Sequence, residues 1–165
     1  MAGTLAIDLG STTTVVAFQA HGDLGPRLLE LTPISTGEPV VVPSLIWLRD
    51  AASSQPLIGR QVIEAGLLEK GGPGLHRDFK RLIGASDQQH TSLLSPEQSG
   101  RLLLEQIWQR LPQELKPERL VLTAPIDSYR GYRQWLLEAT GSLAVAEIAL
   151  VDEPTAAAIG AGLPA

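Results

Sequence analysis

Residues 4–18 read TLAIDLGSTTTVVAF and contain two apolar runs separated by a short polar turn. The first run, residues 4–9, closes at Gly10, and the second covers residues 15–18. Short apolar runs bounded by glycine and small hydroxyl residues are typical of paired β-strands. The pattern predicts a β-hairpin whose first strand ends near Asp8.

The rest of the first fifty residues also favours extended structure. Residues 27–31 form another apolar stretch, and residues 40–42 and 45–48 flank the dipeptide Pro43-Ser44. A residue before proline is biased toward extended backbone, and β-branched side chains fit a pleated surface. This part of the chain is therefore expected to be mainly β.

Helical signals follow. Residues 59–68 have a weak helical period that stops at the breaker in residues 71–74. Ser95 then offers an N-cap hydroxyl, Pro96 takes the first helical position, and Gln98 can return a hydrogen bond to the cap. An apolar face repeats every four residues through Leu103, Ile107 and Leu111, with Leu104 and Trp108 beside it, as far as Pro112.

Strands and helices alternate in the last third of the chain. Residues 119–123 and 146–151 predict two buried strands, and a helix is expected from about 128 to 140, stopped by Gly141. A final helix begins at Glu153-Pro154. A backbone N–H at this position has no partner within the helix, so proline is tolerated there, and the Glu153 carboxylate lies at the positive end of the helix dipole.

The resulting order, β-β-β followed by α-β-α-β-α, predicts the α/β class. It suits a mixed five-stranded sheet with parallel later strands and flanking helices. A chain of 165 residues is the size of one domain and can bury roughly two-thirds of the surface that it exposes when unfolded. The polar residues 85–94 are expected to form a loop.

Composition argues against several classes of function. The net charge is −5 and the basic residues form no stripe, so nucleic acid is not an expected partner. The chain has no cysteines, and we expect His21, His76 and His90 to occupy surface or loop positions rather than to bind metal. No apolar run approaches the ~20 residues that cross a bilayer, and no basic leader precedes the first strand, so we expect a cytoplasmic protein without membrane contact.

Two segments carry residues suited to phosphate chemistry. The turn after Asp8 contains Gly10, Ser11, Thr12 and Thr13, whose backbone N–H groups can converge on an anion while the carboxylate holds waters of Mg²⁺. An ordinary polar hairpin turn explains the same residues. Lys80, followed by Arg81, can stabilise charge on a transferred phosphoryl group, although two solvated bases on a short helix are the simpler interpretation.

Two further segments lie where strands end. Asp152 and Glu153 stand at a strand-to-helix junction, a frequent place for sites, though helix capping alone accounts for them. Thr123-Ala124-Pro125 ends a strand. Arg130, Tyr132 and Arg133 follow on the next helix. We expect the tyrosines to pack and the arginines to lie at the surface.

Taken together and in this order, these segments resemble the ATPase domain of the DnaK-type heat-shock-70 chaperones, which has the actin-like, ribonuclease-H-like fold. The matching segments are residues 6–13, Val42-Pro43-Ser44-Leu45, residues 80–84, the helix start at 94–97, residues 123–125, Arg133-Gln134 and residues 153–159. The last segment, EPTAAAI, is the most specific match. The likeness covers nearly the whole chain.

The resemblance implies roles for individual residues. Lys80 and Glu153 would be catalytic, and Asp8, Gly10, Ser11, Thr12 and Thr13 would bind ATP. Asp8 and Glu153 would hold Mg²⁺ through water, and Pro125 with Arg133 would form a conformational switch. Family partners would be ATP or ADP, with unfolded client proteins and co-chaperones bound only through regions beyond this chain.

Three departures from the family pattern qualify this expectation. Only ten residues separate Gly84 from Ser95, so the small β-rich subdomain that the family inserts there is expected to be largely absent. Asp152 replaces an asparagine and adds a negative charge. The chain stops at Ala165, before the second glycine-rich phosphate loop and the adenosine pocket, so residues 1–165 are expected to be the first lobe alone and to bind ATP weakly.

Two other functions remain open from the sequence. A degenerate relative of the family could act as a protein-interaction module without ATPase activity, using an uncovered face of the lobe. A sugar or acetate kinase of the same fold superfamily would share the first phosphate loop, but the Lys80 segment and the Glu153-Pro154-Thr155 junction fit the chaperones better.

Overall fold

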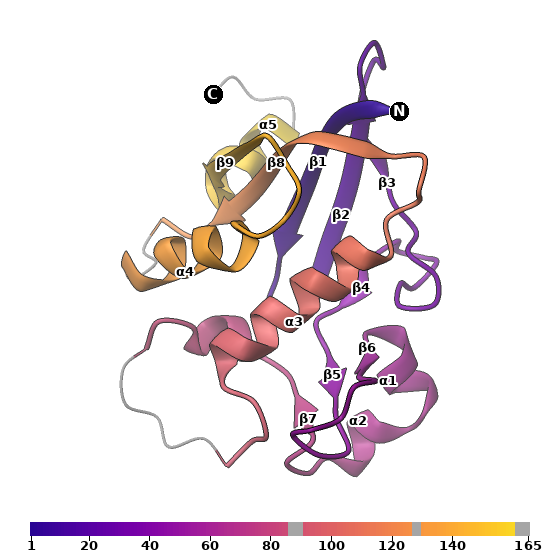
Figure 1. Ribbon diagram of the computed structural model, residues 1–165, viewed down its shortest axis with the longest axis vertical. Coiled ribbons are helices and arrows are strands. Elements are labelled where there is room, and N and C mark those ends of the chain that lie inside the picture. The colour runs from indigo at the N-terminus through magenta and orange to yellow at the C-terminus, as the bar shows by residue number, and fades with distance from the viewer. Residues whose placement is uncertain (86–90, 127–129, 161–165) are drawn as a thin grey trace.

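The computed structural model describes residues 1–85, 91–126 and 130–160. Its centre is one large sheet with strand order β3-β2-β1-β8-β9 (Figure 1). The long strands are β1 (Ala2–Leu9), β2 (Thr13–Ala20), β8 (Lys116–Ala124) and β9 (Glu147–Asp152), and the edge strand β3 is only Arg27–Leu28. A further short strand, β4 (Val42–Pro43), also pairs with β2.

The pairing of the strands confirms the expected mixed sheet. β1 and β2 are antiparallel, with Leu9 opposite Thr14 at the turn, so the predicted hairpin is present. β8 runs parallel to β1, and β9 runs parallel to β8. The carboxyl ends of β1, β8 and β9 therefore meet along one edge, which is where sites commonly form in α/β proteins.

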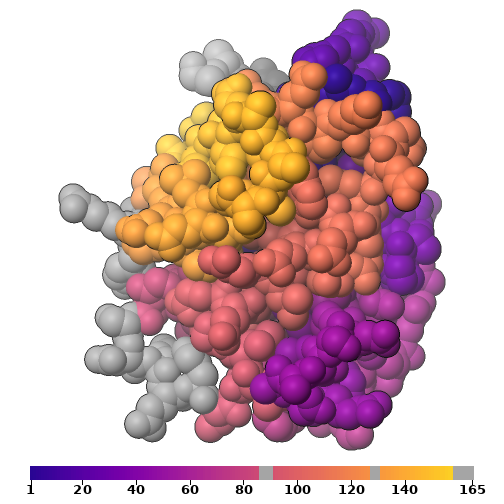
Figure 2. Space-filling model, viewed as in Figure 1, coloured from indigo at the N-terminus to yellow at the C-terminus, as the bar shows by residue number. Residues whose placement is uncertain are grey.

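One face of this sheet carries the main core. Every second residue of β1, namely Leu5, Ile7 and Leu9, is almost fully buried beneath α3 (Pro96–Gln109) and α4 (Arg130–Thr140). Burying a side chain of this size contributes about 1.5–3 kcal/mol. The residues of α3 and α4 form a continuous surface over the strands on this face (Figure 2).

The predicted start of α3 is confirmed in detail. The Ser95 side chain accepts a hydrogen bond from the backbone N–H of Gln98, and the Gln98 side chain accepts one from the backbone N–H of Ser95. These two bonds satisfy donors that a helix start otherwise leaves free. Farther along α3, Gly100 leaves room for the Trp135 ring of α4, since a Cβ at Gly100 would lie 2.6 Å from that ring.

The opposite face of the sheet is thinly covered. The last helix, α5 (Glu153–Gly160), packs against β8 and β9, and Ala156 joins strand residues in lining a pocket of about 360 Å³. Strand residues that line this pocket include Ala6, Asp8, Ala17, Val121, Thr123 and Val151. Most of these side chains are small and apolar.

A small antiparallel sheet, β6-β5-β7, lies beyond the end of the large one (Figure 1). Its strands are β5 (Ile46–Trp47), β6 (Leu57–Ile58) and β7 (Leu75–His76). The helix expected over residues 59–68 is instead two short helices, α1 (Arg60–Glu64) and α2 (Leu67–Lys70), because Gly66 adopts a left-handed conformation with φ 67°. β5 lies within residues 45–48, which were expected to be extended, whereas β6 and β7 were not expected from the sequence.

The positions of the histidines correct one expectation. His76 is only 4% exposed, because β7 turns its side chain inward, so the expected surface or loop position is wrong for this residue. His21 is exposed, as expected, and His90 lies outside the described residues. The expected loop at 85–94 also falls partly outside them, at residues 86–90. None of the helices described has the length and apolar character needed to span a bilayer.

Candidate functional site

Three strand ends place polar side chains along one edge of the large sheet. Asp8 lies near the end of β1, and Thr123 lies near the end of the neighbouring strand β8. The hydroxyl of Thr123 donates a hydrogen bond to the Asp8 carboxylate, which is otherwise exposed. Next along the edge, β9 ends at Asp152, directly before Glu153 opens α5. Parallel strand pairing therefore brings residues more than a hundred positions apart to a single edge.

Lys80 reaches this edge from a separate segment. It lies in the 3₁₀ turn η1 (Phe79–Leu82), which is anchored by the buried Phe79 side chain. The Lys80 ammonium donates a hydrogen bond to Oε1 of Glu153 and forms an ion pair with it. The Lys80 side chain is 11% exposed and that of Glu153 is 35% exposed, so the lysine is largely buried and the pair is partly shielded from solvent.

Tyr132 connects these groups electrostatically. Its pKa is raised well above the usual value, first by burial, then by the negative charge of Glu153, and then by that of Asp8. The Lys80 Nζ atom lies 5.9 Å from the centre of the Tyr132 ring, within the range of a cation–π contact. Asp8, Lys80 and Glu153 therefore lie around one aromatic side chain.

The two residues expected to form a switch lie beside the same edge. Arg133 of α4 forms an ion pair with Asp152 at the end of β9, so this arginine is tied to the sheet. Pro125 directly follows Ala124, which is paired with Asp152 in the parallel ladder. Both residues therefore lie close to the Asp152–Glu153 junction.

The turn between β1 and β2 is shaped by a serine that the sequence did not single out as functional. Ser44 donates a hydrogen bond from its hydroxyl to the Gly10 carbonyl oxygen, 2.8 Å away, and another from its N–H to the Thr12 carbonyl oxygen. A Cβ at Gly10 would lie 2.1 Å from the Thr13 carbonyl oxygen, so only glycine fits the turn as it stands. The Pro43-Ser44 junction is thus a brace for the candidate phosphate loop.

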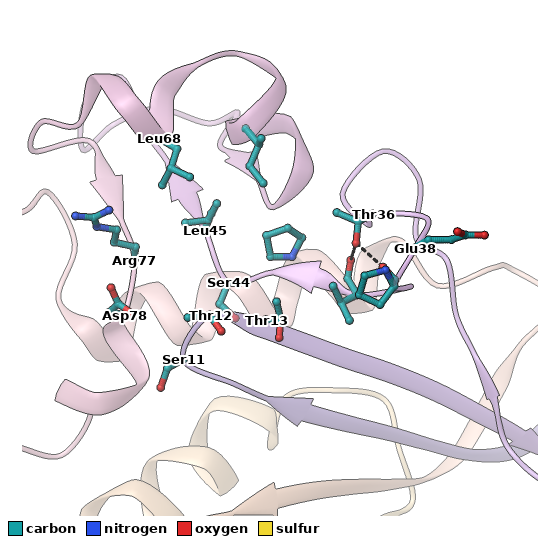
Figure 3. Close-up of a pocket in the computed structure, with 14 residues that line it drawn as sticks. Ser11, Thr12, Thr13, Thr36, Glu38, Ser44, Leu45, Leu68, Arg77 and Asp78 are labelled. Atoms are coloured by element: carbon teal, nitrogen blue, oxygen red, sulfur yellow. Dashed lines mark hydrogen bonds between the residues drawn. The ribbon is translucent and has the colours of Figure 1, made fainter.

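Ser11, Thr12 and Thr13 of this loop help to line a pocket of about 450 Å³ (Figure 3). These three residues lie at the β1–β2 turn, and Arg77 and Asp78 also line the pocket. The described residues that line this pocket do not include Asp8, Lys80 or Glu153. The structure thus brings Asp8, Lys80 and Glu153 to one edge of the sheet, whereas Ser11, Thr12 and Thr13 line a neighbouring pocket.

Direct metal ligation is not supported by the described residues. Within residues 1–85, 91–126 and 130–160, no three His, Asp or Glu side chains gather as a metal site. Mg²⁺ usually keeps several waters and takes only one or two protein carboxylates.

Comparisons with known proteins do not assign the chain to a family. No protein-family model matches it, and no curated protein gives a significant match. The structure establishes an α/β fold with a mixed sheet in which five strands follow the order β3-β2-β1-β8-β9 and β4 also pairs with β2.

Proposed function

We propose that the edge formed by Asp8, Lys80 and Glu153 binds the magnesium-bound phosphates of ATP. The chain would then be the first lobe of an actin-like ATPase domain similar to that of the heat-shock-70 chaperones. The observation that carries this proposal is the shielded Lys80–Glu153 ion pair, which joins residues 73 positions apart. A lysine and two carboxylates at the carboxyl ends of parallel strands are well suited to holding a phosphoryl group and the waters of its metal.

Each residue has a role in this proposal. Asp8 and Glu153 accept hydrogen bonds from water around Mg²⁺, which would neutralise charge on the phosphates. The backbone N–H groups and hydroxyls of Gly10 to Thr13 would contact phosphate oxygens. Lys80 has three donor hydrogens, so it can hold Glu153 with one and donate to the transferred phosphoryl group with another.

The fixed geometry of Lys80 favours a functional role over a purely solvated one. A surface lysine gains little from an ion pair and keeps its side chain mobile. Lys80 instead has a short anchored turn, a carboxylate partner and an aromatic neighbour. These contacts position the ammonium before any ligand arrives, which reduces the entropy lost on binding.

Titration of Mg-ATP into the chain, followed by backbone amide chemical shifts, tests this proposal. Because a single lobe offers one wall of a cleft, we expect a dissociation constant on the order of 1 mM, with shifts near residues 8–13, 80 and 153. Lys80→Ala should weaken binding about tenfold or more. Lys70→Ala removes an exposed lysine of α2 and serves as the matched control. Equal binding of Mg-ATP by the two variants would count against the proposal. Micromolar affinity would contradict the expectation that a single lobe binds Mg-ATP weakly.

A second candidate function rests on the thinly covered face of the sheet. Its 360 Å³ pocket is lined mainly by small apolar side chains, a composition that suits contact with another protein surface. An interaction module of this kind would lose partner binding on Val121→Asp and would be insensitive to Lys80→Ala. If the chain is instead an ATP-binding lobe, Lys80→Ala should weaken Mg-ATP binding and Val121→Asp should not.

A further inference from the structure

The hydroxyl of Tyr132 is buried without a hydrogen-bond partner. The residue is 3% exposed, and its Oη atom has no partner among the described residues. Buried tyrosine hydroxyls usually find a partner, because an unsatisfied one destabilises the folded state. A group that is kept at this cost beside charged residues calls for a reason beyond packing.

The ring of Tyr132 is held firmly in place. Its centre lies 5.5 Å from that of Trp135, with the two planes tilted by 46°. The backbone at Tyr132 packs closely against Gly84, where an added Cβ would lie 3.2 Å from the Tyr132 nitrogen. The hydroxyl therefore has little freedom to turn away toward another partner.

The charged groups around Tyr132 already have other partners. Glu153 accepts a hydrogen bond from Lys80, and Asp8 accepts one from Thr123. Burial and the two carboxylates raise the pKa of the phenol, so Tyr132 remains a neutral O–H donor throughout the physiological range. The site thus contains one preorganised neutral donor in addition to the lysine ammonium.

We propose that Tyr132 donates its O–H hydrogen bond to a phosphate oxygen of the ligand held by Lys80, and so helps the site to select a phosphoryl group. This inference rests on the proposed function. A phosphate oxygen only accepts hydrogen bonds here, and a hydrogen bond to a charged acceptor contributes more than a neutral one. The Lys80 ammonium near the ring would draw such an oxygen toward the same place.

The test is Tyr132→Phe, which removes only the hydroxyl oxygen. Mg-ATP and inorganic phosphate are the two probes, titrated separately and followed by amide shifts in residues 8–13. We expect the affinity for both probes to fall about tenfold. Without ligand, we expect the variant to unfold at the same temperature as the natural protein or a higher one, because an unsatisfied buried polar atom has been removed.

His76→Phe provides a matched control. It removes the other described side chain with an unpartnered buried polar atom, His76 Nε2, which lies away from the carboxylates. This variant should leave the affinity for both probes unchanged.

The outcomes separate the two proposals. If the natural protein binds both probes and Tyr132→Phe binds them equally well, the role of Tyr132 is wrong and the phosphate site stands. If the natural protein binds neither probe, the phosphate site fails and the role of Tyr132 fails with it. A Tyr132→Phe protein that loses stability without ligand would show that the hydroxyl already has a structural partner, such as an ordered water, and would also overturn the inference.

Discussion

Two buried polar atoms lack a hydrogen-bond partner among the described residues, and their surroundings differ sharply. Tyr132 Oη lies on α4 beside a lysine and within electrostatic range of two carboxylates. His76 Nε2 lies on β7, and the residue lines a pocket of about 220 Å³ with a mixed apolar and polar lining that includes Phe79 and Arg77 but no carboxylate among the described residues. Burial lowers the pKa of His76 and so favours the neutral imidazole. Tyr132, by contrast, has charged side chains around it.

The contrast shows that an unsatisfied atom alone does not define a site. Around Tyr132, every charged neighbour is positioned by a strand end or an anchored turn: Lys80 would attract a phosphate, and the two carboxylates would attract the cation that accompanies it. Around His76, burial alone perturbs the side chain, and the described surroundings supply no matching set of charges. We therefore interpret Tyr132 as part of a binding site and His76 as a cost to stability.

The largest expected effect comes from disturbing the support beneath Tyr132. Gly100→Ala places a Cβ 2.6 Å from the Trp135 ring, which packs on Tyr132. We expect a loss of about 2–3 kcal/mol in the free energy of unfolding, measured by chemical denaturation. Gly25→Ala is the control, because nothing lies within 4 Å of its added Cβ. Equal stability of the two variants would mean that α3 and α4 do not pack as described.

A smaller effect is expected at the turn that holds Lys80. Gly84 has φ +80°, a conformation that is strained for alanine, and an added Cβ would approach the Tyr132 nitrogen. Gly84→Ala should therefore cost about 1–2 kcal/mol. Gly66→Ala carries similar backbone strain at φ +67° with no atom within 4 Å, so the difference between the two variants isolates the contact with α4. In thermal unfolding experiments, Gly84→Ala should lose more stability than Gly66→Ala. The two losses should be equal if the contact is absent.

The pH dependence of stability tests the His76 side of the comparison. The folded-state pKa of His76 is lowered from 6.5, so below pH 6.5 the unfolded chain binds a proton that the folded chain does not. Stability should therefore fall as the pH drops from 6.5 to the folded-state pKa, by up to about 1.4 kcal/mol for each pH unit in that window. His76→Phe should reduce this loss, whereas His21→Gln, at an exposed position, should not. Identical pH profiles for the natural protein and His76→Phe would refute the assignment.

The smallest effect on stability is expected at Arg133. The Arg133 and Asp152 side chains are 39% and 41% exposed, so solvent screens their ion pair. Arg133→Gln should change the free energy of unfolding by no more than about 0.5 kcal/mol. If Arg133 is a switch residue, the same variant should nevertheless change the amide shifts of residues 152 and 153. Unchanged amide shifts at residues 152 and 153 would contradict the proposed switch role of Arg133.

Sequence patterns predicted the parts of the fold that depend on local signals. The β1–β2 hairpin follows from its two apolar runs, and the start of α3 follows from the Ser95 capping box. Residues 45–48 were expected to be extended and contain β5, but β6 and β7 of the small sheet were missed because each has two residues, too few for alternation to be recognised. The inward turn of His76 belongs to this sheet and was missed for the same reason.

The candidate site divides along similar lines. Asp8, Lys80 and Glu153 were selected by a family resemblance, since each had an ordinary interpretation when taken alone. The packing of Tyr132 was expected, but its unpartnered hydroxyl depends on how α4 meets η1, and the sequence contains no local signal for that. The brace from Ser44 to Gly10 likewise joins residues 34 positions apart and emerges only from the paired strands.

The central claim, that Asp8, Lys80 and Glu153 surround one metal-bound phosphate group, is tested most directly with Mn²⁺ in place of Mg²⁺. Paramagnetic broadening of backbone amides would be recorded with Mn²⁺ alone and with Mn²⁺ and ATP together, in the natural protein and in Asp8→Asn. The account predicts ATP-dependent broadening centred on residues 8, 80 and 153 that is greatly reduced in Asp8→Asn. Broadening that is independent of ATP, or centred elsewhere on the molecule, would contradict it.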